Sequence, residues 1–278
     1  MSRRSAKLAA LTMICMLSAC GAARASAADS VYRYRKGLHL SREHSLTSKE
    51  LDLLLKGLHS LTGFSGIEID TRGDVTIISR AQFAGGSETA RNLFAAALFG
   101  EESFTIESAD HSSRIAFAEL DSPLRYSDGS QRSYDDWRIK IDFADFKGLH
   151  GDAAALASFD PAMAFLHELA HALLGHTDPV NPADELGDCE RYLNRIRAEL
   201  GLPERQHYYP EQRVTLGPGL SQIYQGTLTF MRKDQDTQKR KQLLVIFDLN
   251  QVFDISQARS KAVVQNELLA QRNHYRGP

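Results

Sequence analysis

The stretch His167-Glu168-Leu169-Ala170-His171 is the H-E-x-x-H pattern, with two histidines four residues apart. Residues four apart lie on one face of an α-helix, so His167 and His171 can direct their imidazoles at one metal ion. Glu168 lies about a third of a turn away, where it can reach a water bound to that metal. A catalytic zinc keeps one position for water, and a nearby carboxylate completes the activation of that water. The stretch therefore predicts two zinc (Zn²⁺) ligands, His167 and His171, and a catalytic general base, Glu168.

The residues around this stretch carry the start and stop signals of a helix. Asp160 is a good N-cap residue, and Pro161 suits the first helical position. Gly175 suits the position after the last turn. The alternative is a buried helix whose histidines are satisfied by hydrogen bonds alone. That alternative is costly, because any buried polar atom that stays unpaired raises the free energy.

The first 28 residues are predicted to be an export signal, followed by one metallopeptidase domain from residue 29 to residue 278. A basic segment precedes an apolar one, residues 8–17, which is too short to span a bilayer as a helix. Leu17-Ser18-Ala19-Cys20 then reads as a bacterial lipobox, which predicts cleavage before Cys20 and a lipid that anchors Cys20 to a membrane. Ordinary cleavage after residue 25 or 27 is the alternative. We expect an outer-membrane lipoprotein facing the periplasm of the bacterial cell envelope, or a secreted protein.

Composition narrows the class of protein further. The formal net charge of −2 over 278 residues shows no bias toward polyanions, so no nucleic-acid partner is expected. Of three cysteines, only Cys189 lies in the predicted domain, which leaves no internal disulfide. A domain of this length can bury a core without one.

Upstream of the H-E-x-x-H stretch, helical and strand-like segments alternate. Leucines at helical spacing predict a helix at 48–61, and alternation around a glycine turn predicts a β-hairpin at 66–78. A second helix is expected at 87–99, and strands at 114–120 and 137–143. This order predicts an α+β, zincin-like fold, in which a twisted mixed sheet packs on the active-site helix. The strand at 137–143 is our candidate for the edge strand that lines the substrate cleft and pairs with an extended peptide.

Downstream of that stretch, a further helix is predicted from Asn181-Pro182 to Leu200, again a cap followed by proline. The last part of the chain predicts strands at 223–231 and 242–249 and a helix at 256–273. A metzincin would need glycine at position 174 and a ligand at 177, but these positions hold leucine and threonine.

The third zinc ligand is therefore expected on the helix that follows. Glu190, nineteen residues past His171, is the favoured candidate, because a carboxylate on a second helix can complete three protein ligands and leave one site for water. The alternatives that remain open are Glu185, Asp188, His176 and Asp178.

The end of this helix resembles a known family. Residues 194–208 read Asn-Arg-Ile-Arg-Ala-Glu-Leu-Gly-Leu-Pro-Glu-Arg-Gln-His-Tyr. Together with the H-E-x-x-H helix, this stretch resembles the NleD-like effector zinc metallopeptidases, whose second helix ends in Gly-Leu-Pro-x-Arg-x-x-Tyr. The resemblance covers roughly residues 155–210 and implies a zinc-dependent endopeptidase acting on a protein. Where that family often carries glutamate before the asparagine, this chain has Leu193.

Arg205 and Tyr208 occupy the last two positions of the family's stretch. Either side chain could donate a hydrogen bond to the oxyanion of a tetrahedral intermediate, which makes both candidates for catalysis. The structural alternative is that Arg205 pairs with a helix carboxylate and Tyr208 packs.

Two functions are compatible with these patterns. The first is a zinc metalloendopeptidase, a hydrolase, whose substrate is a protein or peptide. The second is a non-catalytic envelope lipoprotein that uses the His167/His171 site for a structural metal or for binding a partner. Glu168 favours the first, because a structural site has no use for a base beside its ligands.

Overall fold

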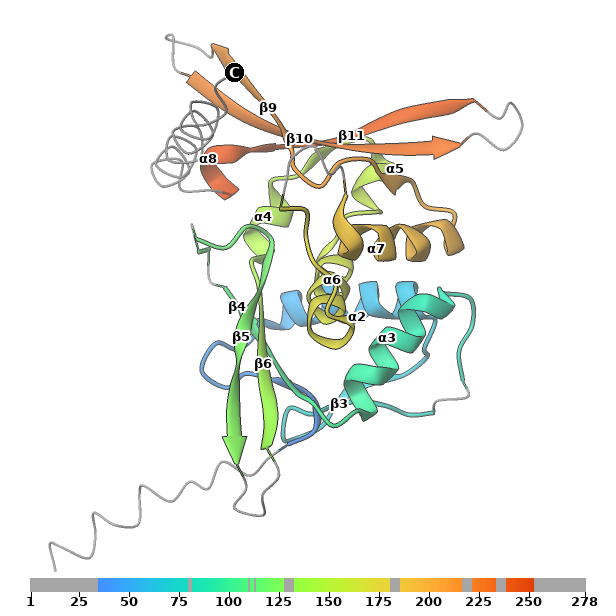
Figure 1. The fold of residues 1–278 in the computed structure, drawn as a ribbon, viewed down its shortest axis with the longest axis vertical. Helices are drawn as coiled ribbons and strands as arrows, with labels where there is room; N and C mark the ends of the chain where they lie inside the picture. The colour runs from blue at the N-terminus through green and yellow to red at the C-terminus, as the bar shows by residue number, and fades with distance from the viewer. Residues whose placement is uncertain are drawn as a thin grey trace, which may run out of the picture. The chain divides into compact units, whose positions relative to one another are not determined.

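The fold is described from a computed structural model, which describes residues 35–79, 82–109, 111–112, 114–127, 133–180, 186–216, 222–233 and 239–252. The chain divides at residue 35, and every element below belongs to the unit Lys36–Pro278 (Figure 1). Three expectations lie outside the described residues: the export signal with Cys20, Glu185, and the helix at 256–273. Among the helices that are described, none combines the length and the apolar character needed to cross a membrane.

Helix α6 (Pro161–Leu174) is the central element and carries the H-E-x-x-H stretch. Asp160 caps its start by accepting a hydrogen bond from the Met163 N–H at 2.7 Å, and Pro161 opens the first turn. Gly175 ends the helix in the left-handed conformation, with φ of 63°. Every residue from Pro161 to Ala170 is buried, which confirms the expected helix and its signals. Three other helices pack against it (Figure 1): α2 (Ser48–Thr62), α3 (Glu88–Phe99) and α7 (Gly187–Glu199).

A four-stranded mixed sheet packs on the same helix. Its order is β1-β4-β6-β5, with bounds β1 (Gly37–Leu40), β4 (Ser103–Ser108), β5 (Ala118–Ser127) and β6 (Ser133–Ile141). Strands β1, β4 and β6 are parallel, and β5 runs antiparallel to β6. The strand predicted at 137–143 is thus β6, which is central, and its proposed place at the sheet edge is wrong. The edge strand beside α6 is β5.

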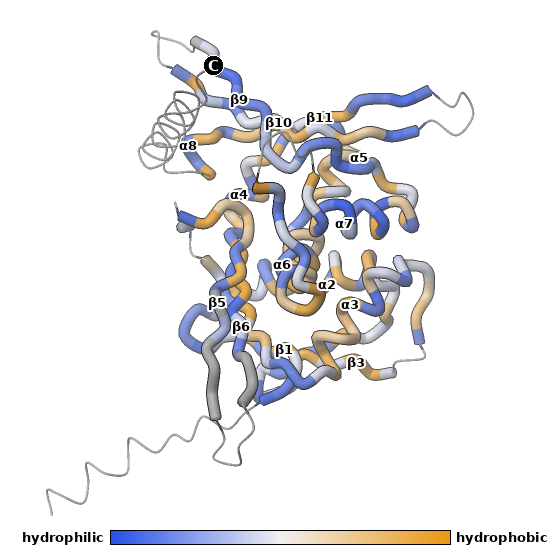
Figure 2. The backbone as a smooth tube through the Cα atoms, in the orientation of Figure 1, coloured by the Kyte–Doolittle hydropathy of each residue, from blue (hydrophilic) through white to orange (hydrophobic). Residues whose placement is uncertain are grey.

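A second sheet has its own small core. Its order is β7-β11-β10-β8 with β9 beside β10, and its members are β7 (His150–Gly151), β8 (Glu204–Arg205), β9 (Glu211–Leu216), β10 (Gln222–Lys233) and β11 (Arg240–Asp248). Apolar side chains of this sheet, including Phe230 and Phe247, bury a cluster with Phe159. Figure 2 shows that the outer ends of β10 and β11 are hydrophilic.

The remaining elements are β2 (Ile67–Ile69), β3 (Val75–Ile77), α4 (Phe143–Lys147), α5 (Ala153–Leu156) and α8 (Leu249–Val252).

Most predicted elements are confirmed, and their errors lie at the boundaries. The helix at 48–61 is α2, which Thr47 caps in a capping box with Glu50. The strand expected from 114 begins at Ala118. The start expected at Asn181-Pro182 lies outside the described residues, and the described helix, α7, begins at Gly187 with φ of 69°. The α+β character of the chain is confirmed.

Candidate metal centre

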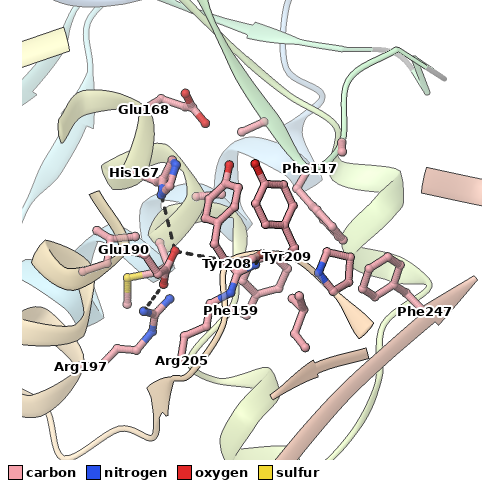
Figure 3. Close-up of a pocket in the computed structure, with 17 residues that line it drawn as sticks. Phe117, Phe159, His167, Glu168, Glu190, Arg197, Arg205, Tyr208, Tyr209 and Phe247 are labelled. Carbon is pink, nitrogen blue, oxygen red and sulfur yellow. Dashed lines mark hydrogen bonds and ion pairs between the residues drawn. The ribbon is translucent and has the colours of Figure 1, made fainter. Parts of the chain in front are cut away.

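Helix α6 presents His167 and Glu168 to a pocket of about 310 Å³ (Figure 3). The pocket is also lined by residues of α7, by Tyr208 and Tyr209, and by the start of β5. Of the four side chains that could hold a metal ion, His167 lines this pocket.

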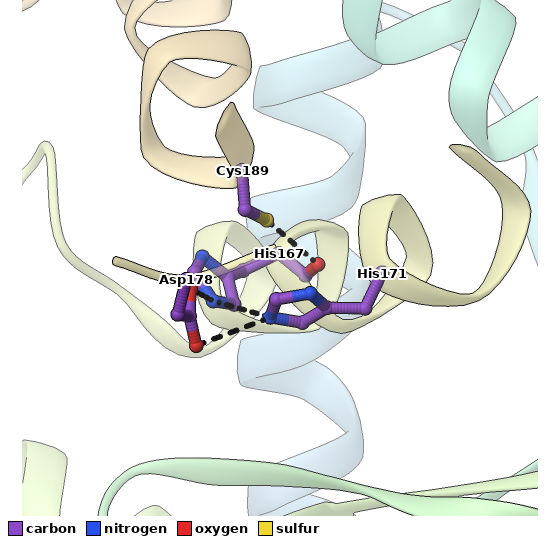
Figure 4. A group of neighbouring side chains, drawn as sticks. All are labelled: His167, His171, Asp178 and Cys189. Atoms are coloured by element: carbon purple, nitrogen blue, oxygen red, sulfur yellow. Dashed lines mark hydrogen bonds and ion pairs between the residues drawn. The ribbon is translucent and has the colours of Figure 1, made fainter. Parts of the chain in front are cut away.

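His167 and His171 face one another as their spacing predicts. Their Nε2 atoms lie 3.0 Å apart, with the ring centroids 4.6 Å apart (Figure 4). The Nδ1 of His171 lies 2.6 Å from the carbonyl oxygen of His176, to which it donates a hydrogen bond. This bond fixes the tautomer that leaves Nε2 free to bind a metal.

Asp178 brings a carboxylate to the same two nitrogens. Because Gly175 turns the chain back on the helix, Asp178 Oδ1 lies 3.2 Å from Nε2 of His167, and Oδ2 lies 3.4 Å from Nε2 of His171. Oδ2 also accepts a hydrogen bond from the Tyr208 hydroxyl at 2.6 Å. Oδ1 is buried, and within the described residues no donor reaches it with hydrogen-bond geometry, despite its short distance to His167. A buried acceptor in that state is what a bound cation would satisfy.

These distances fit a tetrahedral metal. Zinc at about 2.0–2.1 Å from each nitrogen or oxygen ligand sets neighbouring ligand atoms about 3.3 Å apart. The two histidine Nε2 atoms lie 3.0 Å apart, and each lies near a different Asp178 oxygen, at 3.2 Å for Oδ1 and 3.4 Å for Oδ2. Two imidazoles and one carboxylate also form a ligand set that zinc uses in catalytic sites. His167, His171 and Asp178 could therefore hold a metal ion.

Cys189 is the fourth potential ligand of the group. Its sulfur and the ligand atoms of the other three residues all lie within 4.8 Å of one another, and Cys189 is fully buried. The thiol donates a weak hydrogen bond to the carbonyl oxygen of His167 at 3.3 Å. Burial, together with the neighbouring carboxylates, raises the pKa of this thiol.

Asp178 and the histidines favour opposite charges on one another in this structure. Burial opposes ionisation of Asp178, but the adjacent His167 and His171 rings and the hydrogen bond from Tyr208 hold the pKa of that carboxyl well below its usual range. Burial likewise opposes the charged form of His171, but Asp178 and the His176 carbonyl raise the pKa of His171 to about 9.

Glu190, our favoured third ligand, does not join this group. It lies on the Nδ1 side of His167, 3.7 Å from that atom, whereas the metal-facing atom is Nε2. Its carboxylate is fully buried and accepts hydrogen bonds from Arg197 and from Nη1 of Arg205, the latter at 3.2 Å. Burial raises the pKa of Glu190, but the two arginines outweigh burial and lower it to about 2. Glu190 is therefore not among the side chains that could share a metal ion in this structure, whereas Asp178, one of the open alternatives, is.

The other candidates are also placed. Asp188 is exposed and pairs with Arg191 at 3.1 Å. His176 contributes its backbone carbonyl, while its ring packs on Tyr192 at 5.4 Å. Neither contributes a side-chain atom to the metal group.

Glu168 has the surroundings of a general base. It is 7 % exposed, and among the described residues no group forms a hydrogen bond with its carboxylate. Burial raises its pKa, although the two histidines act in the opposite direction. In Figure 3 the carboxylate lies near His167, at the end of the pocket away from Phe247.

Arg205 and Tyr208 divide between their two expected roles. Arg205 follows the structural alternative: besides Glu190, its guanidinium donates to the carbonyl oxygens of His207 and Tyr208. Tyr208 stays at the site, with its hydroxyl on Asp178 and its ring stacked on that of His167 at 6.0 Å.

Sequence reasoning underrated Asp178 and missed Cys189. A signal for Asp178 existed, since the glycine stop at position 175 places residue 178 back alongside the helix. No comparable signal marked Cys189, because its position depends on how α7 packs on α6. No protein-family model, curated protein or solved structure matches this chain.

Proposed function

We propose that this chain is a zinc-dependent metallopeptidase that hydrolyses peptide bonds of a protein or peptide. The observation that carries the proposal is the convergence of His167, His171 and Asp178 within 3.4 Å, beside Glu168, which lines the pocket and has no hydrogen-bond partner among the described residues. Burial raises the pKa of Glu168, and a carboxyl group with a raised pKa in a pocket is suited to proton transfer.

The chain's own residues divide the work. When bound, zinc would supply Lewis acidity, which lowers the pKa of a water and polarises a substrate carbonyl. Glu168 takes the proton of the attacking water on its carboxylate and returns it to the leaving amine as general acid. The His176 carbonyl orients His171, and the Tyr208 hydroxyl orients Asp178. Tyr208 also lines the pocket, and its hydroxyl is a candidate donor to a substrate oxyanion in exchange for its bond to Asp178.

The architecture supports a zincin-like fold. A mixed sheet packs on α6, and its edge strand β5 is antiparallel to its neighbour. Residues at the start of β5 line the pocket, so a peptide pairing with this edge would pass Glu168. The resemblance to the NleD-like effector metallopeptidases is supported in the same way, because the matched Arg205 and Tyr208 contact the metal centre through Glu190 and Asp178.

The test compares three proteins under one metal-buffered condition. The wild type should purify with about one zinc per chain and cleave an unstructured protein such as casein. Glu168→Gln should bind the same amount of zinc but lose hydrolysis by at least about a hundredfold. His167→Ala should lose both. If Glu168→Gln keeps activity within a few-fold of the wild type, the proposed base is wrong.

Cys189 favours a second candidate, a structural metal site in a non-catalytic envelope protein. If its sulfur completes a closed set of four ligands, no position remains for water, as in structural zinc sites. Cys189→Ala separates the two functions. The peptidase keeps its zinc and activity after this substitution, whereas a closed structural site loses the metal.

A further inference from the structure

The pocket beside Glu168 is apolar away from the metal centre. Its walls come from α6, from the loop before β5, and from the second sheet, which Figure 3 shows on the side opposite His167. We call it the Phe117 pocket and define it by Phe117, Phe159, Met163, Ala164, Leu228 and Phe247.

Phe117 holds an unusual backbone conformation to line this pocket. Its φ is 65°, a region that residues with bulky side chains rarely occupy. Two hydrogen bonds of 2.9 Å hold it there: its N–H donates to Asp145 Oδ2, and its carbonyl accepts from the Asp142 N–H. The ring then meets Phe159 and Phe247 edge to face, at centroid distances of 4.9 and 5.3 Å. Strained conformations that the surroundings enforce in this way cluster at binding sites.

Both arginines that line the pocket already have acceptors. Arg197 and Arg205 pair with Glu190, and their guanidinium groups also donate to backbone carbonyl oxygens. An ionised ligand group would lose its hydration in this pocket without gaining a free partner, whereas an apolar group gains from burial.

We propose that the Phe117 pocket receives one large apolar side chain, preferably aromatic, of the peptide substrate next to the bond that is cleaved. The assignment rests on the proposed function, because it places the scissile bond at Glu168. An apolar cavity of about 150 Å³ holds benzene, so a pocket of about 310 Å³ accommodates an aromatic side chain with part of its backbone. Edge-to-face contacts with Phe117 favour a ring over an aliphatic chain of equal size.

A binding assay tests this independently of hydrolysis. The full mature protein carrying Glu168→Gln is titrated with N-acetyl-phenylalaninamide and with the corresponding alanine and aspartate amides, and binding is followed by NMR. The phenylalanine probe should bind with a dissociation constant of about 1 mM, and the other two at least about tenfold more weakly. Equal binding of all three probes would overturn the proposal.

Pocket variants locate the binding. Ala164 lies one turn before Glu168 and faces the pocket, so Ala164→Phe should fill it and weaken the phenylalanine probe at least about tenfold. Ala96→Phe, on the exposed face of α3, is the matched control and should change nothing. Phe117→Gly suits the positive φ, so it should fold and weaken the probe about five- to tenfold. Unchanged binding in both pocket variants would contradict the assignment.

Cleavage profiling separates this inference from the proposed function. The zinc-loaded wild type is incubated with a peptide library, and cleaved bonds are read by mass spectrometry. Aromatic and large aliphatic residues should be enriched at one position beside the cut, and Phe117→Gly should reduce that enrichment. Hydrolysis without such enrichment refutes the pocket assignment alone. Selective probe binding with no hydrolysis by the wild type refutes the peptidase.

Discussion

At the scale of single residues, two carboxylates on opposite sides of His167 have different tasks. Asp178 faces Nε2 of both histidines and is one-third exposed, as expected for a ligand at an open site. Glu190 lies on the Nδ1 side, fully buried between Arg197 and Arg205. Under the proposed function, the first carboxylate binds the metal directly and the second positions His167.

Substitution of each carboxylate should separate these tasks. We expect Asp178→Ala to lose more than about a hundredfold in zinc affinity, since a directly binding group is worth more than a supporting one. Glu190→Gln should lose only about ten- to a hundredfold, but should lower the free energy of unfolding by about 3–5 kcal/mol, because two buried arginines lose their partner. Chelator competition and urea unfolding measure the two quantities. Asp188→Ala is the exposed control. The reverse order of zinc affinities would return the ligand role to Glu190.

Asp145 should make stability depend on pH. Burial raises the pKa of Asp145 to about 7, although the Phe117 N–H acts to lower it. In the unfolded chain this pKa is about 3.9. Between about pH 4 and pH 7 the folded state therefore binds a proton that the unfolded state has released, and stability falls as pH rises through that window.

Asp145→Asn removes this titration and keeps the amide oxygen that can accept from Phe117. The variant should match the wild type near pH 4 and be more stable at pH 8, as measured by urea unfolding at several pH values. The opposite result would contradict this assignment: an Asp145→Asn variant whose free energy of unfolding, relative to that of the wild type, is lower at pH 8 than at pH 4.

At the scale of elements, the contact between α2 and α6 sets the position of the metal helix. Gly57 of α2 faces the first turn of α6, where an added Cβ would lie 2.5 Å from the Cβ of Ala162 and 3.2 Å from Asp160 Oδ2. The two helices can approach this closely because Gly57 has no side chain. The same approach fixes α6 and its histidines against the rest of the domain.

Gly57→Ala should therefore destabilise the protein although alanine is the better helix former. Helix propensity favours alanine over glycine by about 1 kcal/mol, but overpacking against a rigid backbone costs about 1–3 kcal/mol. We expect a net loss of unfolding free energy and a weaker zinc affinity. Ser60→Ala, on the exposed side of the same helix, serves as control and should be neutral or slightly stabilising. A stabilised Gly57→Ala would show that α2 and α6 can move apart freely.

At the scale of the whole molecule, the hydrophobic core does not depend on the metal. The larger cluster of buried apolar residues joins α2, α3, α6 and α7 to the first sheet, and a smaller one lies under the second sheet. In the group that could hold a metal, His171 and Asp178 are only partly buried, whereas His167 and Cys189 are buried.

Removing zinc should loosen the protein without unfolding it. With zinc at about a thousand times its dissociation constant, binding contributes about 4 kcal/mol, so a chelator should lower the unfolding temperature by about 10 °C. Far-ultraviolet circular dichroism at 25 °C should stay unchanged. Complete unfolding by the chelator would instead support the structural metal site.

The predicted anchor belongs to the same scale. Cys20→Ser should release the protein from membranes or block its processing, because lipidation with several acyl chains binds stably and one chain binds only marginally. Fractionation at high salt, with the wild type as reference, measures this. Equal partitioning of the two proteins would favour cleavage after residue 25 or 27.

The sequence by itself determined the parts of the site that depend on local spacing. The helical repeat placed His167, Glu168 and His171 on α6, and the cap, proline and glycine signals predicted its two ends. Leucine spacing and strand alternation likewise predicted most helices and strands and the α+β class. These features follow from interactions between residues close together in the chain, so a single sequence reveals them.

Only the tertiary structure decided which distant groups meet. Asp178 and Glu190 are both acidic and both follow the histidines, and spacing alone did not distinguish ligand from support. The difference came from the turn at Gly175, from Arg197 two turns further along the same helix as Glu190, and from Arg205 on β8, which reaches Glu190 only through the tertiary fold. The sequence likewise did not predict the edge position of β5 or the Phe117 pocket. Strand order, helix packing and ion pairing depend on contacts between residues far apart in sequence, which no local pattern encodes.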